Sequence, residues 1–384
     1  IYDKLKESNN IESAELNLSE EGFKKEIKKI IERENASGNE RQKTNNMTAW
    51  DYWRQGEREF DLKLYEEAIR SYSNAIDRQS NVMIFYHSRG YTYNELGEFE
   101  KAILDCNKAL ELKPDYAQAF NNRGYAYGEL GEYEKAISDY NKAIELNSDN
   151  LESYNNRGYA YGELGEYEKA ISDYNKAIEL NPDYIDAYNN RGCIYDDLGE
   201  YEKAISDYNK AIELNPNYVD AYNNRGGTYD ELVEYEKAIS DYNKAIELNP
   251  NYVDAYNNRG LVYNKLGKHE KAILDYNKAI ELNPVYAVAY NNRGYTYVSM
   301  GEYEKAISDF DKAISINPNY ANPYKHCGTV WKNKEDYKKA LGFYNKAIEL
   351  DPKYKEAYLE RAEVYRLMSN IEKATADEEI AATL

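Results

Sequence analysis

The sequence YNNRGYAYGELGEYEKAISDYNKAI, residues 154–178, decides the fold because it recurs along the chain at a constant spacing. Close copies begin at Phe120, Tyr188, Tyr222, Tyr256 and Tyr290, so the spacing between neighbouring copies is 34 residues. Extended outward, the same frame predicts ten copies, at 49–82, 83–116, 117–150, 151–184, 185–218, 219–252, 253–286, 287–320, 321–354 and 355–384. A fixed period of this length is typical of stacked units that each bury an apolar face against their neighbours.

Each copy predicts two helices joined by a short turn. In the copy quoted above, Tyr154, Gly158 and Tyr161 fall on one face of a first helix. A second apolar stripe comprises Tyr167, Ala170, Ile171, Tyr174, Ala177 and Ile178. Gly165 lies between the two stripes, where a glycine suits the end of a helix, and Pro182 ends the second helix because it forces the preceding residue out of the α region.

Seven positions of this copy carry a resemblance to a known family. They are Tyr154, Gly158, Tyr161, Ala170, Tyr174, Ala177 and Pro182. In this register they resemble the signature of the tetratricopeptide repeat family, and the resemblance extends over about nine tenths of the chain. It implies an all-α fold, a right-handed superhelical solenoid of helix-turn-helix repeats.

A systematic departure from the family pattern is an arginine where the family often has leucine. The arginines are Arg123, Arg157, Arg191, Arg225, Arg259 and Arg293. We expect each to bury its stem beside the apolar stripe and to place its head group on a carboxylate or a tyrosine. The terminal copies also depart, with Glu59 and Glu378 where inner copies carry aromatic or apolar residues. Polar residues are expected there, because one face of a terminal repeat meets water.

The composition limits the class of partner. The formal net charge is −20 and the isoelectric point is near 4.8, which argues against nucleic acid and favours a protein or extended peptide of basic or neutral character. No apolar run approaches the length of a membrane span, so no membrane insertion is expected. Cys106, Cys193 and Cys327 have no spacing typical of disulfides or zinc sites, which suggests a reducing compartment, by default the cytoplasm.

The sequence contains no pattern typical of catalysis, so we expect no enzyme activity, no cofactor and no metal. His87, His269 and His326 lie in different copies, without a recurring partner at triad or ligand spacing. No glycine-rich phosphate loop follows a predicted strand. The recurring Glu-Tyr-Glu-Lys clusters stand where second helices begin, where acidic residues and Glu–Lys pairs ordinarily stabilise a helix.

The face of each first helix opposite its apolar stripe is the candidate binding surface, because the core does not require its residues. In tetratricopeptide repeat proteins the first helices line the concave groove, so the resemblance implies that this face meets a ligand. The predicted ladder consists of Asn122, Asn156, Asn190, Asn224, Asn258 and Asn292. Beside it lie the preceding amides Asn121, Asn155, Asn189, Asn223, Asn257 and Asn291, and the aromatic residues Tyr125, Tyr159 and Tyr295. Amides both donate and accept, so such a ladder can pair with an extended peptide backbone, and it resembles the asparagine ladder of the protein O-GlcNAc transferases. The alternative is a solvated polar face that was duplicated with the repeat.

Three consecutive copies differ at one position of this face. Cys193, Gly227 and Leu261 stand where other copies have tyrosine, and Val233 replaces the glycine between two helices. Either a ligand with bulk at this level or drift without function would explain the change.

Residues 1–48 lie outside the repeats. Phe23, Ile27, Ile30 and Ile31 predict an amphipathic helix at about 19–34, and a polar linker follows at 36–46. The helix could dock on the open end of the first repeat, or it could be the tail of a lost upstream domain, since the chain opens with Ile1 and its N-terminus may have been truncated.

These features together predict a scaffold that binds an extended partner segment in the groove, whose margin carries Glu152, Asp186, Asp220 and Asp254. One alternative is the substrate-docking portion of a larger enzyme whose catalytic domain is not in this chain. Another is self-association by end-to-end stacking.

Overall fold

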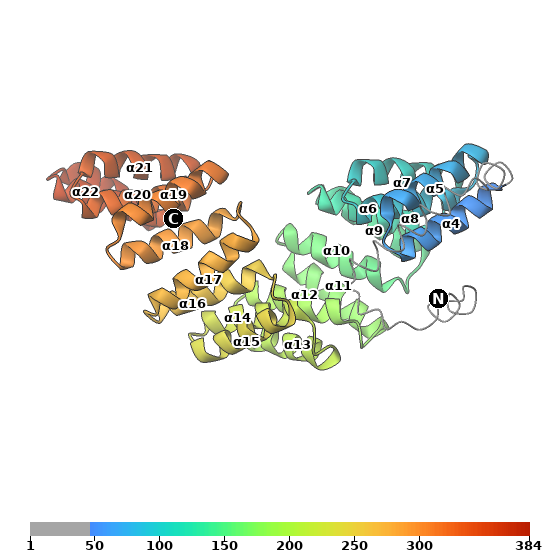
Figure 1. Ribbon diagram of the computed structural model, residues 1–384, viewed down its shortest axis with the longest axis horizontal. Helices are drawn as coiled ribbons and strands as arrows, with labels where there is room; N and C mark the ends of the chain where they lie inside the picture. The colour runs from blue at the N-terminus through green and yellow to red at the C-terminus, as the bar shows by residue number, and fades with distance from the viewer. Residues whose placement is uncertain (1–46) are drawn as a thin grey trace, which may run out of the picture. The chain divides into compact units, whose positions relative to one another are not determined.

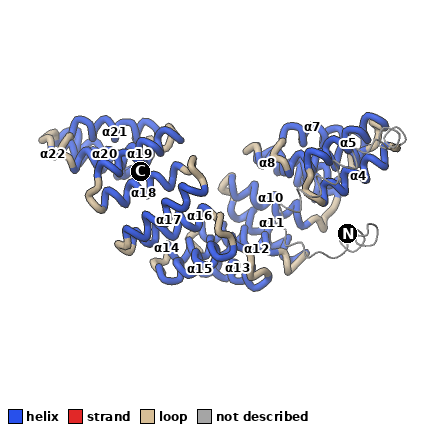
Figure 2. The backbone as a smooth tube through the Cα atoms, in the orientation of Figure 1, coloured by secondary structure: helices blue, strands red, loops and turns tan. Residues whose placement is uncertain are grey.

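The computed structural model describes residues 47–384, and the predicted leader helix at 19–34 and the linker at 36–46 lie outside this range. Within the described residues the regular structure consists of twenty α-helices and no strand (Figure 2). The chain divides into two compact units, with the boundary between Asn181 and Pro182. We describe each unit by itself.

The described part of unit 1 contains four helix pairs. Their helices are α4 (Ala49–Asp61), α5 (Tyr65–Arg78), α6 (Met83–Glu95), α7 (Phe99–Leu112), α8 (Ala117–Glu129), α9 (Tyr133–Leu146), α10 (Leu151–Glu163) and α11 (Tyr167–Leu180). The two helices of each pair pack against each other, and the second helix of one pair packs against the first helix of the next (Figure 1). First helices also contact one another in the order α4, α6, α8 and α10, so they form one row.

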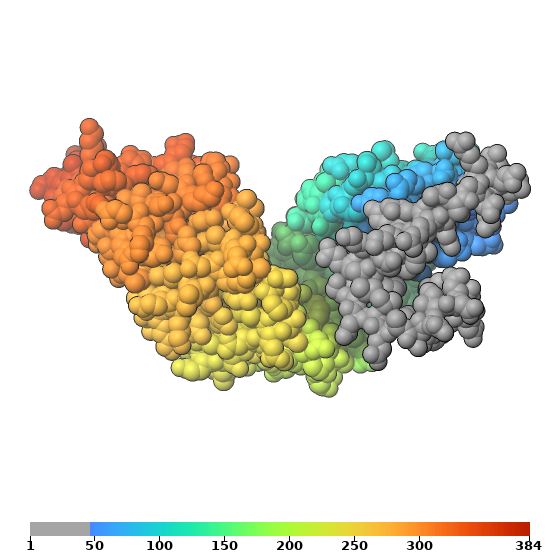
Figure 3. Space-filling model, in the orientation of Figure 1, coloured from blue at the N-terminus to red at the C-terminus, as the bar shows by residue number. Residues whose placement is uncertain are grey.

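Unit 2 contains six pairs of the same kind. Its helices are α12 (Ile185–Asp197), α13 (Tyr201–Leu214), α14 (Val219–Glu231), α15 (Tyr235–Leu248), α16 (Val253–Lys265), α17 (His269–Leu282), α18 (Ala287–Ser299), α19 (Tyr303–Ile316), α20 (Ala321–Asn333), α21 (Tyr337–Leu350), α22 (Lys355–Leu367) and α23 (Ile371–Thr383). The first helices α12 to α22 again contact one another in sequence. In the space-filling view the surface of this unit passes from lime-green to red without a break, because each repeat packs on the next (Figure 3).

A residue with positive φ separates the two helices of each of the ten described pairs. In six pairs it is the expected glycine, for example Gly165 with φ 73°. In α14–α15 the same place is taken by Val233, whose φ of 60° is unfavourable for a β-branched residue. The fold therefore imposes the left-handed conformation even where the residue does not favour it.

Contact between a glycine and an aromatic ring holds the two helices of a pair close together. A Cβ atom added to Gly158 would lie 2.8 Å from Cε1 of Tyr174, and one added to Gly226 would lie 2.8 Å from the same atom of Tyr242. Both rings are almost fully buried. The last pair lacks the ring, because Glu378 occupies its place, and there Ala362 replaces the glycine. In these two pairs the ring leaves no room for a Cβ atom at the glycine position.

The recurring arginines have the structural role expected from the sequence. In the repeat at 151–184, Nε and Nη2 of Arg157 donate to the two carboxylate oxygens of Asp173 at 2.7 and 2.6 Å, and Nη1 donates to Asn141 of the preceding repeat. The guanidinium also lies 5.5 Å from the ring centroid of Tyr154. The same Arg–Asp fork is present in Arg89–Asp105, Arg123–Asp139, Arg191–Asp207, Arg225–Asp241, Arg259–Asp275, Arg293–Asp309 and Arg361–Asp377. These charges are committed to the fold and are not available to a ligand.

The expectation for the first repeat was wrong at Glu59. This side chain does not face water: it is buried, and its carboxylate accepts hydrogen bonds from Ser71 at 2.6 Å and Gln55 at 2.8 Å. The reason is that the first repeat has Gln55 and Ser71 where most repeats have the Arg–Asp fork, and Glu59 supplies the acceptor that these two polar groups need.

Candidate functional site

The asparagine pairs of the first helices lie at the boundary between core and solvent. Of the first amides, Asn121, Asn155, Asn189, Asn257 and Asn291 are buried and Asn223 is partly buried. Of the second amides, Asn122 is buried, and the partly buried ones are Asn156, Asn190, Asn224, Asn258 and Asn292. We call these pairs, together with the residues beside them on the first helices, the amide face. Its second amides, apart from Asn122, are half-buried.

In unit 2 the amides bond to one another across repeats. The Nδ2 of Asn224 donates to Asn189 Oδ1 at 3.1 Å, and that of Asn258 donates to Asn223 at 3.2 Å. Asn292 likewise donates to Asn257 at 2.9 Å. Within each pair the first amide donates to the second, at 3.2–3.4 Å. The result is one relay of hydrogen bonds that runs in a single direction along α12, α14, α16 and α18.

The relay ends on a histidine. His326 stands in α20 where the inner repeats have the second asparagine, and its Nδ1 lies 2.9 Å from Asn291 Oδ1. Because a carboxamide oxygen only accepts, this Nδ1 carries the proton. Burial, with a smaller effect of the Lys325 ammonium, lowers the pKa of His326 to about 3, so the ring is neutral at physiological pH. His326 is therefore part of the amide face and not an acid or base.

In unit 1 the amides have other partners. Asn122 Nδ2 lies 3.1 Å from Nε2 of His87, whose pKa burial lowers to about 4, and Asn121 accepts from the Ser153 hydroxyl at 2.9 Å. Asn155 donates to Asn156 at 3.4 Å. The sequence pattern, which is nearly the same in both units, did not indicate that the amides would bond to one another.

Exposed tyrosines stand beside the amides. Tyr125, Tyr159 and Tyr295 have exposed fractions of 40%, 47% and 45%. Tyr91 of α6 is exposed to 41% at the equivalent position, although the sequence analysis did not include it among the site residues. Its position within the 34-residue frame was sufficient to identify it. These rings offer apolar area with a polar tip, a combination common at binding surfaces.

The margin acids of unit 2 are held by tyrosines. Asp186, Asp220 and Asp254 accept phenolic hydrogen bonds from the tyrosine that precedes the next first helix; the donors are Tyr218, Tyr252 and Tyr286, at 2.8, 2.7 and 2.7 Å. Burial and the neighbouring carboxylate raise the pKa of each of these tyrosines. The phenolic hydrogen bonds fix the direction of these carboxylates.

The described residues offer little for chemistry. Among residues 47–384 no group of three or more His, Cys, Asp or Glu could hold a metal ion. The thiols are unpaired, and burial raises the pKa of Cys106 to about 12. In the same residues no helix has the length and apolar character of a bilayer span.

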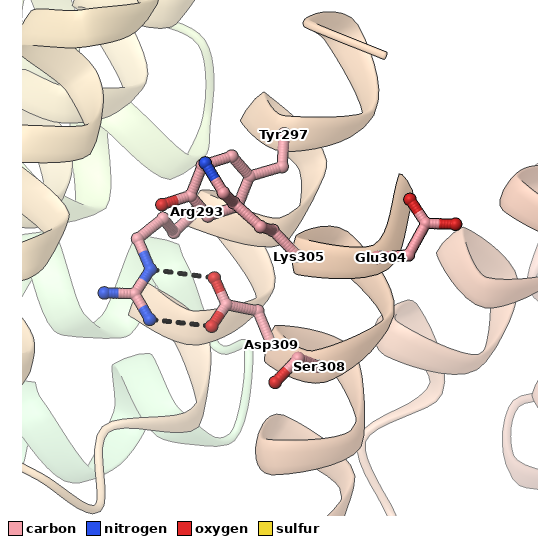
Figure 4. Close-up of a pocket in the computed structure, with 6 residues that line it drawn as sticks. All are labelled: Arg293, Tyr297, Glu304, Lys305, Ser308 and Asp309. Atoms are coloured by element: carbon pink, nitrogen blue, oxygen red, sulfur yellow. Dashed lines mark hydrogen bonds and ion pairs between the residues drawn. The ribbon is translucent and has the colours of Figure 1, made fainter. Parts of the chain in front are cut away.

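A shallow recess on α18 and α19 is occupied by structural groups. It has a volume of about 390 Å³ and is lined by Arg293, Tyr297, Glu304, Lys305, Ser308 and Asp309. Figure 4 shows Arg293 turned toward Asp309, to whose carboxylate it donates two hydrogen bonds. The Arg–Asp fork in this recess is the one that recurs in other repeats, so these two charges are already paired.

Sequence comparison agrees with this geometry. The tetratricopeptide repeat profile matches residues 117–150, 151–184, 185–218, 253–286 and 287–320. Related profiles described as TPR repeat or tetratricopeptide repeat match 90–131, 207–240, 234–267, 329–354 and 343–376, so the matches together span most of the chain. The chain belongs to the tetratricopeptide repeat family. No curated relative matches it significantly.

Solved tetratricopeptide repeat structures share the fold. One from Parabacteroides merdae is 26% identical, covers 65% of this chain and 98% of its own, and has a TM-score of 0.54. Yeast Tom70 is 19% identical over 88% of this chain and 92% of its own, with a TM-score of 0.51. The human IFIT1 dimer with m7Gppp-AAAA is 17% identical, covers 88% of this chain and 90% of its own, and has a TM-score of 0.55. The last two show the fold alone, so the ligand class of this tetratricopeptide repeat protein must be argued from its own residues.

Proposed function

We propose that this tetratricopeptide repeat protein is a non-catalytic scaffold that binds an extended segment of a partner protein along the amide face of its first helices. The observation that carries the proposal is the relay from Asn189 to His326, because it holds a row of half-accessible amides in a fixed orientation.

The relay leaves hydrogen-bonding capacity for a ligand. An asparagine amide has two N–H groups and two acceptor lone pairs. Asn258 and Asn292 each donate once and accept once within the relay, which leaves one N–H and one lone pair on each. A peptide backbone offers the complementary groups at every residue, so recognition by these amides does not depend on sequence.

Preorganisation favours binding to such a row. A hydrogen bond contributes only about 0.5–1.5 kcal/mol net, so several are needed for useful affinity. Ordering a free side chain on binding costs about 0.5–1.5 kcal/mol, a similar amount. Amides that are already ordered by their neighbours avoid most of that cost.

Charge selects the partner. The chain carries a net charge of −20, and the margin acids Asp186, Asp220 and Asp254 are oriented by tyrosine hydroxyls. Segments with lysine or arginine flanking the bound backbone match this margin, whereas a nucleic acid would be repelled by it. The partner that fits best is therefore a basic extended peptide.

Peptide selection on the full chain tests the proposal. A displayed random library is selected on the immobilised protein, and affinities of recovered peptides are measured by calorimetry. The triple variant Asn224→Ala, Asn258→Ala and Asn292→Ala should weaken binding at least tenfold, which corresponds to about 1.4 kcal/mol. The control is Lys210→Ala with Lys244→Ala, at partly exposed positions of second helices. Equal affinity for the wild type and the triple variant, with unchanged melting of both, would overturn the proposal.

A further inference from the structure

Two positions of the first helices change together between the units. In α8 the exposed tyrosine is Tyr125, and three residues later, one helical turn along the same face, stands Gly128. In α14 the tyrosine is replaced by Gly227, and the residue one turn later is Asp230. Helix α12 has the same combination of a small residue and an aspartate, which is Asp196. Compared with α8, helices α12 and α14 therefore have a smaller side chain at the tyrosine position and a carboxylate one turn later.

The hydroxyl of a buried tyrosine lies beside Gly227. Tyr242 of α15 is exposed to only 2%, and a Cβ atom added to Gly227 would lie 3.9 Å from its Oη atom. Within residues 47–384 the structure records no hydrogen bond for this hydroxyl. Its oxygen is not one of the enclosed polar atoms of the described residues, so this hydroxyl is both unbonded within the protein and open to a partner from outside. With glycine at position 227, no side chain at that position covers it.

The neighbouring carboxylates show what kind of partner is missing. Lys265 of α16 places its ammonium 2.8 and 2.9 Å from the two oxygens of Asp230. One repeat earlier, Asp196 stands in the position of Asp230, and the residue in the position of Lys265 is Glu231. Asp196 therefore faces a like charge where Asp230 has a cation.

Asp196 is bonded but not neutralised. Its Oδ1 accepts from the Thr228 hydroxyl at 2.6 Å, which fixes the carboxylate beside Gly227. Burial, and then the charges of Asp197 and Glu231, raise the pKa of Asp196. The site thus has an excess of negative charge in a half-buried position, which an external cation would relieve.

We propose that the recess formed by Asp196, Gly227, Glu231 and the Tyr242 hydroxyl accepts the cationic head group of a lysine or arginine side chain from the bound peptide. The head group occupies, beside Asp196, the place that the Lys265 ammonium occupies beside Asp230. It donates to the Asp196 carboxylate and to Tyr242 Oη, and the absent side chain of Gly227 provides its entry. This assignment rests on the proposed function, since it names a specificity pocket on the peptide-binding face.

The decisive variant supplies the missing cation from within the protein. Glu231→Lys repeats the arrangement of Lys265 and Asp230, so its ammonium should occupy the recess. Peptides selected on the wild type should carry an excess of Lys or Arg at one position, and their affinity for the Glu231→Lys variant should fall about tenfold, the factor for losing one charge contact. The matched control is Glu129→Lys, the same substitution at the equivalent position of unit 1, where the residue 35 positions earlier is Asn94 and not an aspartate.

A second variant tests the recess proposal by filling the space beside position 227 with a side chain. Gly227→Tyr installs the tyrosine that unit 1 has at the equivalent positions, Tyr125 and Tyr159. The new ring should cover the Tyr242 hydroxyl. The substitution should lower the affinity for peptides that carry the Lys or Arg more strongly than the affinity for peptides without that residue, so that the preference is lost.

The outcomes separate the two proposals. The recess proposal is wrong if the selected peptides show no excess of Lys or Arg, or if the wild type and Glu231→Lys bind them with equal affinity. Either result leaves the proposal of peptide binding standing. A wild-type protein that selects no peptide overturns both. A loss of affinity in Glu129→Lys as large as in Glu231→Lys also overturns the recess, because the effect is then one of net charge.

Discussion

Arg225 and Asp241 form a two-point fork: Nε and Nη2 of the arginine donate to the two carboxylate oxygens at 2.7 Å each. Both side chains are largely buried, with exposed fractions of 16% and 9%. Where a repeat lacks the arginine of this pair, it also lacks the aspartate. In the repeat at 321–354 the arginine position holds Cys327 and the aspartate position holds Phe343, so neither charge remains. A buried charge without its partner would be costly.

Breaking this fork on one side should destabilise unit 2. Arg225→Leu leaves the Asp241 carboxylate buried without its cation, and we expect a loss of about 3 kcal/mol in unfolding free energy. The double variant Arg225→Cys with Asp241→Phe copies the residues of the 321–354 repeat and should remain within about 1 kcal/mol of the wild type, as volume-conserving apolar replacements do. Amide hydrogen exchange in α14 and α15 measures the stability change in both variants. The effect should be local, because each repeat couples mainly to its neighbours. A double variant as unstable as the single one would contradict this account.

Val233 offers a stabilising substitution. Its φ of 60° costs a β-branched residue about 1–2 kcal/mol, whereas glycine occupies this region freely. Val233→Gly should therefore raise the unfolding free energy by about 1 kcal/mol in urea denaturation. The control is Val285→Gly, at another exposed valine that has no positive φ, where the added freedom of the unfolded chain should make the change neutral or slightly unfavourable.

Two helical glycines should respond to alanine in opposite directions. At Gly226 the added methyl group would meet the buried ring of Tyr242 at 2.8 Å, and overpacking of this kind costs about 1–3 kcal/mol. At Gly342 of α21 no atom lies within 4 Å of the added group, and the higher helix propensity of alanine should stabilise the protein by about 1 kcal/mol. Thermal denaturation of the two variants compares them directly. Equal effects would show that the ring does not require the glycine.

Acid should weaken the end of the amide relay through His326. Its pKa is lowered to about 3 in the folded chain, against a usual value of 6.5, so the unfolded chain binds the proton more tightly. This contribution to stability is complete above pH 6.5 and is lost as the pH falls toward 3. At pH 5 the loss should reach about 1–2 kcal/mol, at 1.36 kcal/mol per pKa unit.

The matched variant for this prediction is His326→Asn, which installs the residue that the inner repeats carry and retains a donor to Asn291. The difference in melting temperature between pH 7.5 and pH 5 should be smaller in the variant than in the wild type. An identical pH dependence of the two proteins would show that His326 does not titrate as described.

The sequence by itself determined the local structure of this protein. The 34-residue period, the apolar stripes and residues such as Gly165 and Pro182 predict the helix pairs, because these signals depend only on helical periodicity and on the backbone preferences of single residues. The arginine pattern, lying beside an apolar stripe, was also enough to predict that the head group of Arg157 meets a carboxylate or a tyrosine.

The tertiary structure decided which residues meet across repeats. The bonds from Asn292 to Asn257 and from Lys265 to Asp230 each join residues 35 positions apart, and they depend on how far one repeat is rotated and displaced on the previous one. The burial of Glu59 and the unpartnered hydroxyl of Tyr242 likewise arise from packing between helices. No local pattern encodes these relations, because the side chains involved have the same helical setting in every copy and differ only in what the neighbouring repeat places against them.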